Sequence, residues 1–287
     1  MRLVLGIDGG GTGCRAAVAD SGGRILGRGE AASANIVSDP EGARVNIEAA
    51  ARAALDASGS GADFDDLVAV LGLAGANLPA AAARLAERLP FARARIMTDA
   101  AIALRGAHGR EDGITATCGT GSVFAAQRNG EVSTVGGWGL ILGDHGSGAR
   151  LGRTLLEAAL LAHDGLTPST ALLAEVVADA GGPEGLVDFA QGASPADFAR
   201  YAPRVVAAAA AGDAAAERLL AEAEAVVAAS IDRLAGNDPL PVCFHGGLGG
   251  VFAARLADRY AGRVREAKGT ALDGALDMAR EMAGGTG

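Results

Sequence analysis

One arrangement of elements occurs twice in this chain, and it limits the possible folds more than any other feature. Residues 3–29, LVLGIDGGGTGCRAAVADSGGRILGRG, and residues 113–137, GITATCGTGSVFAAQRNGEVSTVGG, each have the pattern of strand, glycine turn, strand, tight turn and strand. The GTG of residues 119–121 falls where the GGT of residues 10–12 stands in the first stretch. The duplication predicts two similar α/β halves, each opening with an antiparallel β-meander.

The rest of the chain predicts helices and further strands around these two meanders. Asp39 followed by Pro40 is a typical helix start, and it predicts a helix to about residue 57. Further strands are expected over 67–76, 93–99 and 241–246, and further helices up to about 89, from about 100, over 146–162, 169–180, 196–211, 213–235, from 251, and over 271–283.

The domain organisation follows from the duplication. We expect an N-terminal domain of residues 1–108 and a C-terminal domain of residues 109–287, joined by a hinge near 105–112. The last helix, about 271–284, is expected to pack back on the first domain. The length of 287 residues suits one large or two medium domains.

Composition excludes several classes of function. The net charge is −9 and the chain has no basic block, so we expect no nucleic-acid partner. No apolar run approaches the roughly 20 residues of a membrane helix, and the start does not have the pattern of a signal peptide. These features predict a cytoplasmic protein without a membrane partner.

The cysteines and the lysine narrow the chemistry. Cys14, Cys118 and Cys243 are scattered and form no CxxC motif, so we expect buried hydrophobic side chains rather than disulfides or a zinc site. Lys268 is the only lysine, and EAKGTA does not supply the GxxxxGK[ST] pattern of a P-loop. A nucleoside triphosphate would therefore need another kind of phosphate site.

Three glycine clusters offer such a site, although each has a structural alternative. Glycine in a tight hairpin commonly serves to reach positive φ. However, the two corresponding turns, with a third cluster at 246–250 after a late strand, also provide loops whose backbone N–H groups can approach anionic oxygens closely. Thr12, Thr120 and Ser122 would add hydroxyl donors.

The motifs IDGGGT, TDA, CGTGS, GGWG…GDHGSGA and HGGLGG, in that order, resemble the sugar kinase/heat-shock/actin superfamily. Within it they are similar to the N-acetylglucosamine kinases and bacterial glucosamine kinases, which are grouped with the BadF/BadG-type ATPases. IDGGGTGCRA, SANI, GLAGA and LLAHDGL are most similar to glucosamine kinases, whereas GGWG is more like the N-acetylglucosamine kinases. The acyl preference stays open at this point.

The resemblance implies two ribonuclease-H-like, actin-like ATPase domains with ATP in the cleft between them. It also implies a kinase that transfers phosphate to O6 of glucosamine or N-acetylglucosamine, with ATP and Mg²⁺ as cofactors, and a homodimer is typical of relatives. The nucleotide contacts implied are Gly10, Gly11 and Thr12 in the first turn, Gly119, Thr120 and Gly121 in the second, and Gly246 and Gly247 against the adenosine.

Acidic residues near these turns are candidates for the chemistry. Asp8 would repel phosphate, so we expect it to orient Mg²⁺ through water. Asp99, at the end of a strand, is by resemblance the general base that takes the proton from the sugar hydroxyl, and its alternative is a helix N-cap. Asp144 could accept from a sugar hydroxyl, or could cap the helix that follows it.

The remaining candidate sugar ligands are Asn35, Gly137 and Trp138. Asn35 is a sugar ligand by resemblance and a turn residue otherwise. Trp138, the only tryptophan, stands among glycines in a loop, which is less typical of a core residue. His145 is predicted to face either the sugar or the solvent. The other three histidines belong to no motif, and we expect them to be structural.

Two other functions compete with an amino-sugar kinase. One is a BadF-type ATPase that activates a partner enzyme, for which a cysteine-bound iron–sulfur cluster would be expected. The other is a kinase of a different hexose. A DNA-binding regulator is disfavoured because the first strand starts at Leu3 and leaves no room for a DNA-binding head.

Overall fold

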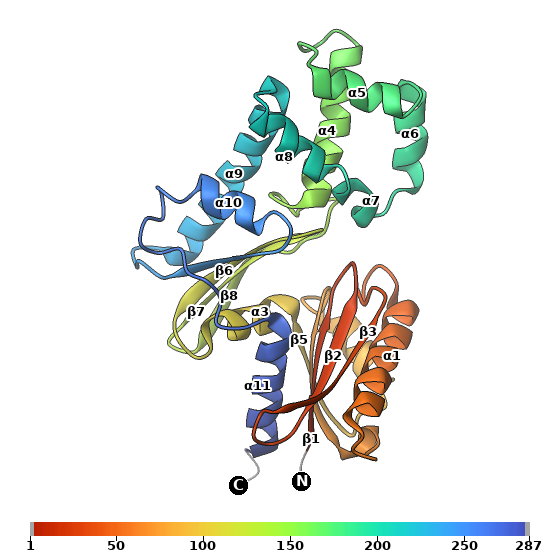
Figure 1. The fold of residues 1–287 in the computed structure, drawn as a ribbon, viewed down its shortest axis with the longest axis vertical. Coiled ribbons are helices and arrows are strands. Elements are labelled where there is room, and N and C mark those ends of the chain that lie inside the picture. Colours follow the sequence, from red (N-terminus) through yellow and green to blue (C-terminus); the bar gives the residue numbers. More distant parts are fainter. Residues whose placement is uncertain (1–2, 285–287) are drawn as a thin grey trace. The chain divides into compact units, whose positions relative to one another are not determined.

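The computed structural model of the chain describes residues 3–284 and contains an α/β fold with two mixed sheets (Figure 1). Contacts divide the chain into two compact units. The first contains residues up to 115, residues 125–134 and residues from 265 onward, and the second contains 116–124 and 135–264. The domain limits expected from the sequence, 1–108 and 109–287, stay a prediction.

The first sheet has five strands in the order β3-β2-β1-β4-β5. The meander β1–β2–β3 is antiparallel, while β4 and β5 run parallel to β1. The strands are β1 (Leu3–Gly9), β2 (Cys14–Ala19), β3 (Ile25–Ala31), β4 (Leu67–Leu73) and β5 (Arg93–Thr98). The carboxyl ends of the three parallel strands therefore meet at one edge.

Helix α1 (Pro40–Ser58) covers one face of this sheet. The Asp39 side chain accepts from the Gly42 N–H at 2.9 Å, and Gly59 ends the helix with φ 61°, so the expected cap is confirmed. A β-carbon on Gly27 or Gly29 of β3 would overlap the backbone of α1. The glycines thus let helix and sheet approach closely, and α2 (Pro79–Ala86) follows β4 at the rim of the same core.

Helices α3 (Asp99–His108) and α11 (Ala271–Gly284) are associated with the opposite face (Figure 1). α11 packs on β1, β4 and α3, although it comes from the far end of the chain. A β-carbon on Gly106 or Gly274 would overlap the backbone of the other helix or the turn before it. This close crossing fixes the helix that Asp99 begins.

The second sheet has the order β8-β7-β6-β9. Its strands are β6 (Gly113–Cys118), β7 (Ser122–Arg128), β8 (Glu131–Gly136) and β9 (Val242–His245). The helices of the second unit are α4 (Gly148–His163), α5 (Ala171–Asp179), α6 (Pro183–Gly192), α7 (Pro195–Ala199), α8 (Ala202–Ala210), α9 (Ala214–Ala235) and α10 (Gly249–Arg255). Within residues 3–284, no helix is long and apolar enough to cross a membrane.

Several expectations need correction. The helix expected over 196–211 is two helices, α7 and α8, because Pro203 begins a new helix and cannot lie inside a continuous one. Helix α6 was not expected at all. Strand β4 ends at Leu73, three residues earlier than predicted, and strand β5 ends at Thr98.

Candidate active site

The first glycine turn, residues 10–13, joins β1 to β2 and closes with a hydrogen bond from the Gly10 N–H to the Gly13 carbonyl at 2.9 Å. Gly10 and Gly11 are not among the described residues that have a positive φ. A β-carbon on Gly11 would meet no atom within 4 Å, and one on Gly10 would come no nearer than 3.9 Å. Neither conformation nor packing requires these two glycines, so the space they leave can serve a ligand.

This turn is held by the segment that follows β3. The Gly10 carbonyl accepts from the Ala34 N–H at 2.9 Å and from the Ser33 hydroxyl at 3.2 Å. The Asn46 amide of α1 in turn donates to the Ser33 carbonyl at 2.7 Å. The segment after β3 therefore fixes the glycine turn, while a β-carbon on Gly11 would still meet no atom within 4 Å.

Asn35 lies in this supporting segment. Its side-chain oxygen accepts from the N–H groups of Val37 and Ser38 at 3.0 and 3.2 Å, which is the turn role considered for it. The Ile36 N–H donates to the Ala74 carbonyl after β4, so the segment is joined to the next loop along the edge. The side-chain oxygen of Asn35 therefore accepts hydrogen bonds within the turn. The side-chain N–H₂ group of Asn35 is the part that could donate to a ligand.

Asp99 stands at the same edge of the sheet. Gly9 pairs with Leu73 and Leu73 with Thr98 in the parallel register, so the residues that follow these three positions lie side by side. The Asp99 carboxylate accepts from the Ala100 N–H at 2.8 Å and is half-buried. The N-cap of α3 is Thr98, which accepts from Ala101, so the N-cap alternative for Asp99 is wrong.

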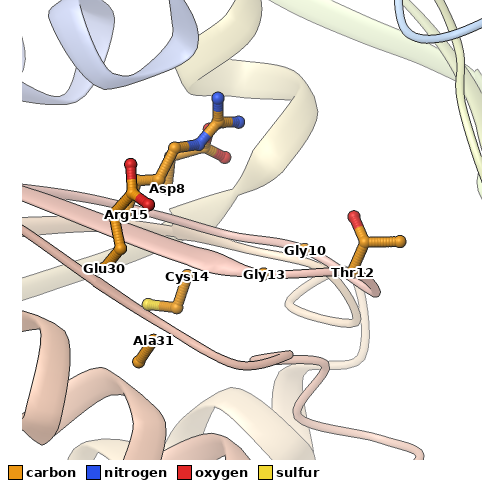
Figure 2. A pocket seen from close by; sticks show the side chains of 8 residues that line it. All are labelled: Asp8, Gly10, Thr12, Gly13, Cys14, Arg15, Glu30 and Ala31. Carbon is orange, nitrogen blue, oxygen red and sulfur yellow. The ribbon is translucent and has the colours of Figure 1, made fainter.

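Asp8 is the next-to-last residue of β1, and it pairs in register with Arg15 of β2 (Figure 2). The two side chains form an ion pair at 2.7 Å, with Asp8 12% exposed and Arg15 62% exposed. Burial raises the pKa of Asp8, and the Arg15 charge partly opposes that rise. Both residues line a pocket of about 420 Å³ together with Gly10, Thr12, Gly13, Cys14, Glu30 and Ala31.

This pocket fits a magnesium ion that arrives with phosphate. Mg²⁺ prefers oxygen ligands and usually keeps several waters, so one carboxylate such as Asp8 suffices when phosphates supply the rest. Within residues 3–284, no group of three His, Cys, Asp or Glu side chains could hold a metal ion. The three cysteines are buried and, within residues 3–284, form no disulfide, and burial raises the pKa of Cys14 and of Cys118 to about 12.

The second glycine turn, residues 119–121, joins β6 to β7. The Gly119 N–H donates to the Gly121 carbonyl at 2.9 Å, and the Gly119 carbonyl accepts from Gly148 at the start of α4 at 2.8 Å. The Thr120 carbonyl accepts from Ala149 at 3.2 Å. The first N–H groups of α4 therefore hold the turn itself.

The third glycine cluster lies against this second turn. The Leu248 N–H donates to the Cys118 carbonyl at 2.9 Å. Gly246 has φ 83°, and a β-carbon there would lie 2.5 Å from the Cys118 carbonyl carbon and 2.6 Å from the Gly119 nitrogen. A β-carbon on Gly247 would meet no atom within 4 Å. Gly246 is thus required by the fold, whereas Gly247 presents open backbone.

Asp144 organises the loop between β8 and α4. It has φ 55°, is 9% exposed, and accepts from the Gly139 N–H at 3.1 Å. Its other oxygen lies 2.9 Å from where a β-carbon of Gly121 would be. Burial raises its pKa, while hydrogen bonds from Gly139 and Ser122 oppose the rise. The N-cap of α4 is Ser147, so the helix-cap alternative for Asp144 is wrong.

The same loop exposes apolar side chains. Trp138 is 68% exposed and therefore is not a core residue. Ile141 and Leu142 are 83% and 84% exposed, and neither was singled out from the sequence. Gly137 has φ 75°, and its N–H donates to the Ser122 carbonyl at 3.0 Å. The loop thus presents an apolar surface from a backbone that is tied to β7.

Arg15 and Glu30 were also missed, although they line the first pocket. A signal was available, since an Arg at the second position of a strand can pair across a hairpin. However, the partner depends on the register of β2 against β1, which the sequence does not reveal.

The model of the BadF/BadG/BcrA/BcrD ATPase family matches residues 5–258. The chain belongs to this family. Its members use ATP, as the family description states. The resemblance inferred from the motifs is confirmed.

Among curated relatives, the glucosamine kinase GspK of Vibrio cholerae is 32% identical over 286 residues, which cover 97% of this chain and 96% of the relative. The crystal structure of the "putative N-acetylglucosamine kinase" of Chromobacterium violaceum is 32% identical, has a TM-score of 0.90, and matches over 97% of this chain and 99% of that chain.

A ROK family glucokinase from Streptomyces griseus, solved with glucose and AMPPNP, matches at 20% identity with a TM-score of 0.54 over 97% of this chain and 99% of that chain. At this identity the likeness concerns the fold alone. Together the structural matches confirm the expected two-domain, actin-like α/β fold.

Proposed function

We propose that this protein is an ATP-dependent amino-sugar kinase that transfers the γ-phosphate of ATP to O6 of glucosamine or N-acetylglucosamine. Family membership and the two relatives described above, both named as kinases of these sugars, support the phosphotransferase activity. The site residues below are assigned on the geometry of each half and on the motifs.

The phosphates are assigned to the glycine turns. Gly10, Gly11 and Thr12 would meet the phosphate chain through open backbone N–H groups and a hydroxyl. Gly119, Thr120 and Gly121 would supply the second turn, and Gly246 and Gly247 the adenosine contact. When bound, Mg²⁺ neutralises the charge of the transferring phosphoryl group, and Asp8 would hold it through water.

The sugar is assigned to Asp99 and Asn35 of the first unit and to Gly137, Trp138 and Asp144 of the second, on the motifs. A sugar hydroxyl is a weak nucleophile, so the Asp99 carboxylate would take its proton as the bond to phosphorus forms. The Asn35 amide would donate to a second hydroxyl. Trp138 would cover the sugar ring beside Gly137, and the second oxygen of Asp144 would accept from a hydroxyl.

One observation carries this proposal. A half-buried carboxylate, Asp99, lies on the same sheet edge as a glycine turn whose glycines serve neither conformation nor packing. Ligands of open α/β sheets bind at the carboxyl ends of strands, and this edge offers both a base and an approach for phosphate.

The test is ADP release with a coupled assay across glucosamine, N-acetylglucosamine, N-acetylmannosamine and glucose. The proposal expects release that depends on an amino sugar, and ³¹P–¹H correlation of the product should place phosphate on O6. Release with glucose alone would replace it by a kinase of another hexose. Release without any sugar would favour an ATPase that activates a partner. A homodimer stays a prediction, which light scattering after gel filtration would check.

A further inference from the structure

Three charged side chains form a ladder across the first meander. Asp8 of β1 pairs in register with Arg15 of β2, and Arg15 pairs with Glu30 of β3. Side chains at directly paired positions lie on one face, about 4.5–5.5 Å apart at their β-carbons. All three line the 420 Å³ pocket beside the first glycine turn, and Figure 2 shows the Arg15 guanidinium against Asp8.

The ladder places a cation between two carboxylates that differ in burial. The Asp8 side chain is 12% exposed, so its charge is costly without a partner, and Arg15 compensates it at 2.7 Å. Glu30 is exposed and pairs in register with Arg15 on the side of β2 opposite β1. Arg15 is itself 62% exposed, so its side chain can change partner without repacking the core.

A hydrated Mg²⁺ held by Asp8 would compete with this guanidinium for the carboxylate. A guanidinium and a Mg²⁺ beside one carboxylate repel each other, and the repulsion is stronger where water is partly excluded. Arg15 therefore opposes the approach of the metal to Asp8 while it keeps this position, and moving away relieves the repulsion. Glu30 is the carboxylate on the ladder that can receive the guanidinium.

We propose that Arg15 is the resident counter-cation of Asp8 in the metal-free protein, and that arrival of the magnesium nucleotide transfers its guanidinium from Asp8 to Glu30. Arg15 and Glu30 are then positioning residues that set the affinity for the metal–nucleotide complex. The proposal rests on the proposed function, because it requires that the pocket takes a magnesium nucleotide.

The decisive measurement is the affinity for ADP by isothermal titration calorimetry, once with Mg²⁺ and once with EDTA. The proteins are wild type, Arg15→Gln, Glu30→Gln and the control Arg28→Gln. Arg28 is an exposed arginine of β3 that pairs in register with Ala17 and does not line the pocket.

The transfer predicts opposite effects at the two ends of the ladder. Arg15→Gln should bind Mg·ADP about three- to tenfold more tightly, because no ion pair must be broken, and should bind metal-free ADP no more tightly. Glu30→Gln should bind Mg·ADP about threefold more weakly, because the displaced guanidinium has lost its acceptor. Arg28→Gln should match wild type in both titrations.

Each other outcome decides against the proposal. If Arg15→Gln weakens Mg·ADP and metal-free ADP alike, Arg15 is a phosphate ligand and no transfer occurs. Unchanged affinities would show that the ion pair does not oppose the metal. Failure of wild type to bind ADP at all would instead overturn the proposed function, so the two failures are distinguishable.

Thermal unfolding in EDTA provides a second readout without any nucleotide. Arg15→Gln should lower the Tm of the metal-free protein, because a buried Asp8 carboxylate loses its partner. Adding Asp8→Asn in that background should restore most of the loss. If the double variant is as unstable as Arg15→Gln, Arg15 does not act by compensating Asp8.

Discussion

The two glycine turns look alike in sequence but are built for different reasons. At the first turn, Gly10 and Gly11 have ordinary φ values and no close protein neighbour, so the chain itself has no need of glycine. At the second, Gly119 is as open as Gly10, but a β-carbon on Gly121 would lie 2.9 Å from Asp144. Gly246, beside this turn, has φ 83°, and a β-carbon there would lie 2.5 Å from the Cys118 carbonyl. The comparison teaches that a glycine motif can reserve space for a ligand in one place and for the protein in another.

The largest expected effect is at Asp99, which shares its edge with the first turn. Asp99→Asn should cut kcat by roughly 10²-fold or more, because the amide cannot take the sugar proton. Sugar and ATP binding should change little, since the side chain keeps its shape and its bond from Ala100. Steady-state kinetics with both substrates would measure this.

A near-normal kcat in a folded Asp99→Asn protein would remove Asp99 as the base. The first turn would then be a phosphate site without adjacent chemistry, and the contrast between the two turns would concern nucleotide binding alone.

The second effect separates the turns directly. Gly246→Ala should lower the free energy of unfolding by about 2–4 kcal/mol, because positive φ strains alanine and its β-carbon meets the Cys118 carbonyl. Gly11→Ala should change that free energy by less than about 0.5 kcal/mol. It should raise the KM for ATP, because the methyl would enter the space proposed for phosphate. Urea unfolding and kinetics would be compared on both variants.

Equal destabilisation by the two alanines would mean that the first turn is also required by the fold. An unchanged KM for ATP in Gly11→Ala would mean that nothing approaches Gly11 closely. Either result would contradict the distinction drawn between the turns.

Local signals in the sequence predicted much of the frame around the turns. Asp39 and Pro40 fix the start of α1, because one caps the helix and the other has the φ that its first turn needs. Hydrophobic runs and the positions of the glycines predicted the strands and the repeated β-meander. Pro203 was visible as well, and taking it as a helix break would have separated α7 from α8.

Contacts between distant positions could not be predicted in this way. Asp8 was expected to face a metal, but its pairing with Arg15 depends on the hairpin register. Asp144 was predicted to accept from a sugar hydroxyl or to cap a helix, whereas its left-handed backbone and the hydrogen bond that it accepts from Gly139 belong to a loop conformation that no pattern indicates. Helix α6 was not predicted, because its segment has the composition of a loop, with glycine at positions Gly182, Gly185 and Gly192.

The third effect concerns the exposed loop before the second unit's α4. Trp138→Ala should leave stability unchanged, since the side chain is 68% exposed, but should reduce kcat/KM for N-acetylglucosamine by about tenfold or more and for glucosamine by less. An acetamido methyl has apolar surface that the indole can cover, while an ammonium group has none. Ile141→Ala, 83% exposed in the same loop, is the matched control and should affect both sugars little.

Equal losses for the two sugars would show that Trp138 does not contact the group on C2. Losses of the same size in Ile141→Ala would show that the whole apolar loop, rather than the indole, meets the sugar.

The smallest expected effect concerns the buried His108. His108 ends α3, is 5% exposed, and its Nε2 lies 3.0 Å from the Ile114 carbonyl. The neutral ring donates there from Nε2. Burial lowers the pKa of His108, and the Lys268 charge adds to this, while the Ile114 bond and Glu111 oppose it.

Since the folded pKa of His108 lies below the unfolded value of about 6.5, the unfolded chain binds the extra proton first as pH falls. The contribution of His108 to the free energy of unfolding should therefore be constant at pH values above the unfolded pKa. It should decrease as the pH falls from the unfolded pKa towards the folded pKa. His108→Gln keeps a donor for the Ile114 carbonyl but cannot titrate, so its stability should depend less on pH than that of wild type between pH 7.5 and 5. Urea unfolding of both proteins across that range isolates the difference, because contributions from other groups cancel. Parallel profiles would mean that His108 titrates alike in both states, and a steeper profile in the variant would reverse the sign of the argument.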